Sequence, residues 1–154
     1  MKRIIFAIAV ITLLTSAHYQ KSGLTPGGSW TFRSKQYTAN KFLRHRESTT
    51  IYDTTQKPRL DFIIDFHAHI PSASGKFKVI QGMPMAEDQI DIGIGIMNGT
   101  GLAAYSTNGG NGKETIDVIV SEGKMKISGT GIELANQKDP KDTGLLSFDI
   151  TIQQ

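Results

Sequence analysis

The sequence contains no cysteine. This excludes disulfide bonds, thiolate metal ligands and a cysteine nucleophile, and it leaves no thiol that could carry a lipid anchor. The fold therefore depends on the packing of its own core. Long hydrophobic runs are also scarce, because the only one extends from Ile4 to Leu14 and no second apolar segment follows it. We expect no transmembrane segment in the mature chain.

The N-terminal hydrophobic run has the features of a secretory signal peptide. Lys2 and Arg3 precede it, and the small residues 15–17 follow it as a cleavage site. The run is about half as long as the roughly 20 residues that cross a bilayer. We expect residues 1–17 to be removed on export and residues 18–28, polar and rich in glycine, to form a flexible tether. A retained membrane anchor is the alternative.

The mature chain carries almost no net charge. Removing 17 of the 154 residues leaves 137, enough for one domain, which we expect at residues 29–154. The 17 Lys and Arg residues become 15 after loss of Lys2 and Arg3, against 14 Asp and Glu residues. This balance gives no argument for a nucleic-acid partner.

One local excess of positive charge remains between residues 33 and 46. No acidic residue interrupts this segment, whose basic residues are Arg33, Lys35, Lys41, Arg44 and Arg46. Such a group is typical of a solvated strand face and loop, which is our prediction. Contact with an acidic glycan or a lipid headgroup is the alternative.

Helical periodicity of useful length is absent beyond the signal peptide. Short segments rich in β-branched and aromatic residues follow Ser29, separated by turn residues at intervals of roughly ten. The clearest strand extends from Leu60 to Ile70, and the strongest hairpin reverses at Glu122-Gly123. The pattern predicts an all-β fold of roughly eight to ten short strands, either an antiparallel β-sandwich or a lipocalin-like β-barrel. Trp30, the only tryptophan, is the expected core anchor.

Several strings of residues resemble one family. They are Ser29-Trp30-Thr31-Phe32, Pro71 to Val79, Tyr105 to Gly112 and Gly123 to Gly129. In these strings the chain resembles the small envelope lipoproteins of Bacteroidota, and the resemblance implies an all-β envelope domain without assigned catalytic residues. Members of that family usually carry a lipid-bearing Cys where this chain has His18, so the resemblance does not extend to membrane anchoring.

One motif could hold a metal ion. Asp65, His67 and His69 alternate along the Leu60–Ile70 segment, as the His-x-His pair on the first metal-binding strand of amidohydrolases does. An amidohydrolase barrel needs about 250 residues and alternating helices, whereas this chain continues for only 85 residues after His69. The polar outer face of a half-buried strand explains the three residues without a metal, so we assign no metal ligand.

Other candidate sites lack the pattern that their chemistry needs. Glu87, Asp88 and Asp91 could pair as acid and base, but no aromatic sugar platform accompanies them. The segment from Asn136 to Gly144 lacks the ligand spacing of a calcium loop and is expected to be a solvated hairpin loop. No Gly-x-Ser-x-Gly elbow or phosphate loop is present. We assign no catalytic or cofactor-binding residue and no cofactor.

The sequence thus favours an exported, periplasmic or extracellular protein that is not an enzyme. We expect a binding or structural module of the cell envelope whose ligand is a small molecule, a glycan or another envelope protein. A metal-dependent hydrolase built on Asp65, His67 and His69 is the alternative function.

Overall fold

A computed structural model of the chain describes residues 26–67, 69–98, 101–107 and 114–153. The expected signal peptide and most of the expected tether lie outside these residues. The described residues form strands and turns, and among them no helix has the length and hydropathy that crossing a membrane requires. The predicted all-β fold is therefore confirmed.

Eleven strands follow one another along the described chain. They are β1 (Gly27–Phe32), β2 (Lys35–Thr38), β3 (Lys41–His45), β4 (Ser48–Tyr52), β5 (Arg59–Phe66), β6 (Gly75–Ile80), β7 (Gln89–Asn98), β8 (Gly101–Thr107), β9 (Thr115–Ser121), β10 (Lys124–Asn136) and β11 (Thr143–Gln153).

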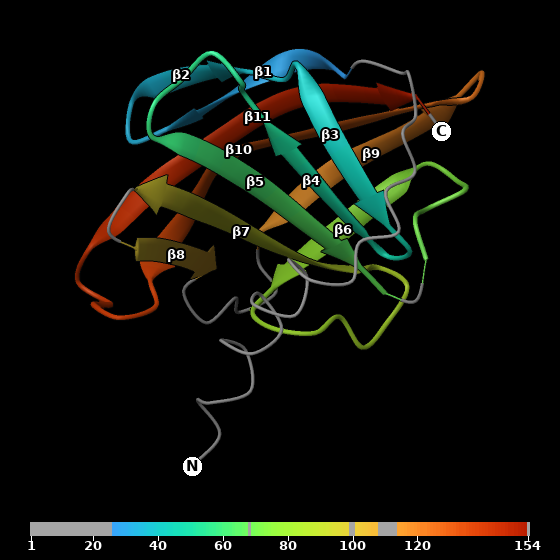
Figure 1. The fold of residues 1–154 in the computed structure, drawn as a ribbon. Coiled ribbons are helices and arrows are strands. Elements are labelled where there is room, and N and C mark those ends of the chain that lie inside the picture. Colours follow the sequence, from blue (N-terminus) through green and yellow to red (C-terminus); the bar gives the residue numbers. More distant parts are fainter. Residues whose placement is uncertain (1–25, 68, 99–100, 108–113, 154) are drawn as a thin grey trace.

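All of the strands belong to one sheet in the order β2-β1-β11-β10-β9-β6-β7-β5-β4-β3, and β8 pairs with both β7 and β10. The sheet folds over into two layers, with β3, β4, β5, β7 and β8 in front of β1, β10 and β11 in Figure 1. β9 and β6 connect the layers at one end, and β8 connects them at the other. The strands thus enclose the core as a barrel-like sandwich.

The strand arrangement departs from the prediction in three details. The number of strands exceeds the expected eight to ten, because the basic segment around Lys41 forms a strand of its own. The pairing of β6 with β7 is parallel, whereas the other pairs are antiparallel. β5 ends at Phe66 rather than Ile70, because the chain turns directly after it and the His69 amide donates to the His67 carbonyl.

The domain begins earlier than its expected start at Ser29. Gly27 and Gly28 belong to β1, where they pair with Thr151 and Ile150. Gly28 has a φ of 101°, which L side chains rarely adopt, and a Cβ atom there would collide with the Asp149 carbonyl. Gly28, one of the glycines that suggested a flexible tether, is therefore required by the close approach of β1 to β11.

Aromatic rings from both layers meet in the centre of the core. The Phe62 and Phe148 ring centroids are 4.9 Å apart, and those of Phe62 and Trp30 are 6.0 Å apart. Trp30 stacks on Tyr37 at 5.4 Å and is only 1% exposed. The prediction that Trp30 is a core anchor is confirmed.

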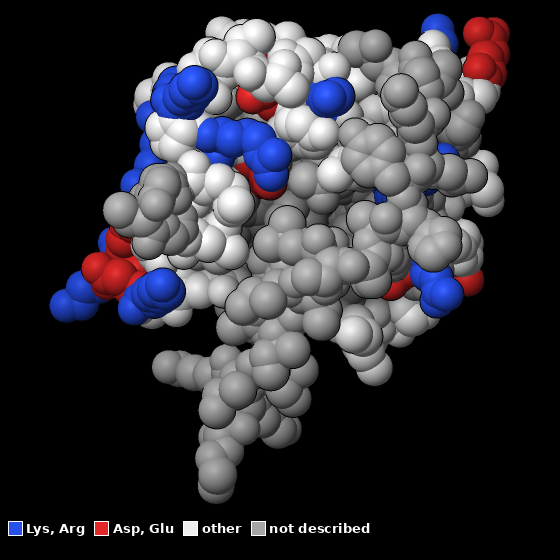
Figure 2. Space-filling view, in the orientation of Figure 1, with Lys and Arg blue, Asp and Glu red and all other residues white. Residues whose placement is uncertain are grey.

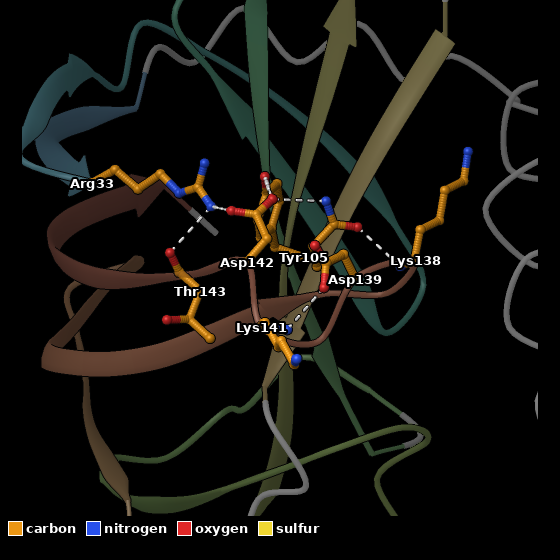
Figure 3. A network of polar contacts seen from close by, with 8 residues as sticks. Arg33, Tyr105, Lys138, Asp139, Lys141, Asp142 and Thr143 are labelled. Carbon is orange, nitrogen blue, oxygen red and sulfur yellow. Dashed lines mark hydrogen bonds and ion pairs between the residues drawn. The ribbon is translucent and has the colours of Figure 1, made fainter.

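A polar network joins the loop before β11 to the β1–β2 turn and to β8 (Figure 3). The Asp142 carboxylate accepts hydrogen bonds from the Tyr105 hydroxyl at 2.7 Å and from the Asn136 amide at 2.9 Å, and it pairs with Arg33. Asn136, Tyr105 and Arg33 together hold the pKa of Asp142 at about 2. The guanidinium of Arg33 also lies 4.7 Å from the centre of the Tyr105 ring. The expected solvated loop is therefore tied to two other elements.

We predict that Trp30→Ala lowers the free energy of unfolding by about 3–5 kcal/mol, because it removes a large ring from between the two layers. Ile119→Ala is the matched control, since Ile119 is 51% exposed and should change stability by no more than about 0.5 kcal/mol. Urea unfolding monitored by circular dichroism measures both. A loss below about 1 kcal/mol for Trp30→Ala would contradict the packing described here.

Candidate functional site

Among the described residues, the most exposed large apolar side chains lie in one loop. Residues 81–88, which we call the Met loop, connect β6 to β7. Met83 is 79% exposed and Met85 is 76% exposed, whereas Pro84 between them is buried. Exposed methionines are flexible and polarisable, and they are common at surfaces that bind other molecules.

Hydrogen bonds hold the Met loop from several sides. The His67 Nδ1 atom lies 2.8 Å from the Pro84 carbonyl oxygen. The Met85 amide donates to the Gln89 side chain at 2.9 Å, and the Gln89 amide donates to the Ala86 carbonyl at 3.0 Å. The loop therefore presents its two methionines from a fixed backbone, which lowers the entropy lost on binding.

A pair of acidic residues lies beneath this loop. Asp65 on β5 is the register partner of Asp91 on β7, so the two side chains are neighbours on the outer side of the layer. Asp91 is only 4% exposed. Its carboxylate accepts hydrogen bonds from the amides of Ile92 and of Gly82, and Gly82 is part of the Met loop. Asp65 is hydrogen-bonded to Ser48.

Burial and mutual repulsion favour the protonated form of this pair. Burial raises the pKa of Asp91 to about 7, and the charge of Asp65 acts in the same direction. Burial also raises the pKa of Asp65, with a contribution from Glu47. Below about pH 7 the pair therefore tends to retain a proton, because two adjacent carboxylates that are shielded from solvent cannot both ionise at low cost.

The three residues of the motif that could hold a metal ion do not come together. Because β5 ends at Phe66, His67 and His69 do not share the face of one strand with Asp65. The His67 ring contacts the Met loop, and His69 is exposed. Among the described residues, no three His, Cys, Asp or Glu side chains are placed to hold a metal ion.

The other acidic candidates are also separated. Asp88 forms an ion pair with Lys78 at 2.8 Å, Glu87 is exposed, and Asp91 is buried on the sheet. The three side chains therefore do not form the acid and base pair that their spacing allowed.

Most of the basic segment is exposed. On the face of the molecule seen in Figure 2, Lys and Arg side chains lie in separate groups, and some of them have acidic atoms beside them. Arg33, Lys35, Lys41 and Arg46 are exposed, as the predicted solvated face requires. Arg44 departs from the prediction, because its Nε and Nη2 atoms are buried.

The sequence contained signals for the Met loop and for Asp91. Two methionines around a proline in a polar segment indicate an exposed apolar contact. Asp91 lies between Ile90 and Ile92, and the next residues on its face are Gly93 and Gly95. Small residues leave room for a covering segment, but the sequence does not show which segment covers the carboxylate.

Comparisons with protein-family models, with curated proteins and with solved structures gave no match to this chain.

We predict that the acid pair makes the protein less stable as the pH rises. The pKa of Asp91 is 3.8 when unperturbed and about 7 in the fold, so the folded state keeps a proton that the unfolded state loses. The free energy of unfolding should therefore fall between these two pH values, by at most about 1.4 kcal/mol per pH unit, and level off above them.

Asp91→Asn should remove most of this dependence and should be more stable than the wild type at alkaline pH. Asp117→Asn is the control, because Asp117 is exposed and pairs with Lys76. Chemical denaturation across the pH range measures the slope for each protein. An unchanged slope in Asp91→Asn would show that Asp91 ionises normally in the folded state.

Proposed function

We propose that the protein is an exported, non-catalytic module of the bacterial cell envelope that binds an apolar surface of another envelope protein through the Met loop. The N-terminal charge and apolar run support export, and the resemblance to Bacteroidota envelope lipoproteins supports the location. The observation that carries the binding role is the pair of exposed methionines on a loop whose backbone is fixed.

The filled core favours binding at the surface over binding inside a barrel. A lipocalin-like carrier keeps an open interior for its ligand. Here Trp30, Phe62 and Phe148 contact one another across the space between the layers. The envelope protein bound by the Met loop is therefore expected to contact loops or outer faces.

The Met loop suits a weak, transient contact. Met83 and Met85 expose apolar side chains, and the buried Pro84 keeps them apart. Two methionines contribute only a small part of the roughly 1,200–2,000 Å² that a stable complex buries. Because the backbone of the Met loop is already fixed, binding costs little conformational entropy, and this partly compensates for the small buried area.

We predict that a photoreactive amino acid at position 85 forms a discrete cross-link to an envelope protein in the producing bacterium. The same group at position 145 is the control, because Leu145 is 59% exposed on a different strand, β11. Met83→Gln should abolish the cross-link from position 85 and change stability by no more than about 0.5 kcal/mol. Equal cross-linking from both positions would refute a role for the Met loop.

The intact mass of the exported protein tests the proposed export separately from the binding role. The exported protein should lack the first 17 residues or close to that number, because the small residues 15–17 follow the apolar run. Intact-mass spectrometry of the envelope fraction measures the mature N-terminus. A protein that retains residues 1–17, or that is found only in the cytoplasm, would contradict export.

A further inference from the structure

Arg44 lies on the inner side of the sheet, next to Thr49. The two residues are register partners in the β3–β4 pair, and Thr49 is in turn the partner of Ile64 on β5. Thr49 and Ile64 are both 0% exposed, so this row of side chains faces the core. A positively charged group therefore enters an otherwise apolar layer.

The polar atoms of this pair are buried without partners. Among the described residues, the Nε and Nη2 atoms of Arg44 and the Oγ1 atom of Thr49 have no hydrogen-bond partner. Burial lowers the pKa of the Arg44 guanidinium, and no neighbouring charge among the described residues offsets that effect. A buried cation and a buried hydroxyl without partners both cost free energy. An anion held by these donors would offset that cost.

The unpartnered nitrogen atoms define the shape of that anion. Nε and Nη2 lie on the same edge of the planar guanidinium group, and this edge donates two parallel hydrogen bonds to the two oxygens of a carboxylate. The Thr49 hydroxyl can donate a third hydrogen bond to the same group. A carboxylate thus matches both the charge and the geometry of the donors.

We propose that Arg44 and Thr49 form a binding site for the carboxylate group of a small organic acid with an apolar body. Phe42 on β3 and Ile64 on β5 face the same side of the layer, so the surroundings favour an apolar body over an inorganic ion. β3 is the last strand of the sheet, and Arg44 is half-buried, so the site lies at the border of the layer. This inference is independent of the Met loop and of export.

Trp30 provides a reporter for the site. It is the only tryptophan, and it contacts Phe62, the β5 partner of Ile51, which lies two residues from Thr49 on β4. Its own Nε1 atom is also buried and has no hydrogen-bond partner in the part of the chain that the structure describes. The experiment titrates the protein with sodium octanoate, sodium acetate and sodium phosphate at constant ionic strength and records tryptophan fluorescence and Tm.

Octanoate should change the fluorescence of Trp30 in a saturable manner and raise the Tm, because it binds only the folded state. Acetate should bind at least about tenfold more weakly, since it lacks the apolar body. Arg44→Lys should weaken octanoate binding by about tenfold or more, because an ammonium group cannot form the paired hydrogen bonds. Lys41→Gln, an exposed change on the same strand, should leave binding unaltered.

Arg44→Met separates a binding role from a structural one. If Arg44 serves a ligand, this variant should lose octanoate binding and melt at or above the Tm of the ligand-free wild type, because the unpartnered charge is gone. A lower Tm together with no binding by the wild type would assign Arg44 to the fold and overturn the proposal. Should Arg44→Met fail to fold, Arg44→Lys and Thr49→Val carry the test.

Three further results would overturn the site. Octanoate binding that persists in Arg44→Met would place the ligand elsewhere. Binding of phosphate without binding of either carboxylate would show a different anion specificity. Equal affinity for acetate and octanoate would show that no apolar surface contributes.

Discussion

Two long strands, β7 and β10, each change their pairing partner along their length, and this constraint organises the fold. β7 pairs with β6 up to Asp91 and with β8 from Gly93 onward. β10 pairs with β9 in its first half and with β8 in its last residues, with a bulge between Gly129 and Ile132. Each change of partner interrupts the backbone ladder, and side chains then supply the missing hydrogen bonds. At the bulge in the β10–β11 pair, the Ser147 hydroxyl accepts a hydrogen bond from the Gly131 amide.

Asp91 has the corresponding role on β7, and this explains why a carboxylate is buried beside a second one. The parallel strand β6 leaves β7 at this point, and the Asp91 carboxylate accepts the amides of Ile92 and Gly82. Asp91 also lies at the base of the Met loop, because it binds the Gly82 amide. The local irregularity that closes the sheet therefore also fixes the loop that carries our proposed contact.

Alternation along the sequence predicted much of the fold but little of the site. The hairpin at Glu122-Gly123 is confirmed, because φ above zero and period-two burial are local properties. The parallel β6–β7 pair was missed, since alternation shows which face a residue occupies and not which strand lies beside it. The environment of Arg44 was missed for the same reason: a charge at the border of a sheet can face either side, and only the strand register decides.

The pairing of β1 with β11 brings the two ends of the domain together. Gly27 is the register partner of Thr151, so β1 begins at the edge of the molecule where β11 ends. A short linker could join these ends, and new termini could then be opened at the exposed Glu122-Gly123 turn. A circularly permuted chain of this kind would convert the central β9–β10 hairpin into the terminal strands. The order of the strands along the chain would thereby change, while the pairing of the strands in the sheet stayed the same.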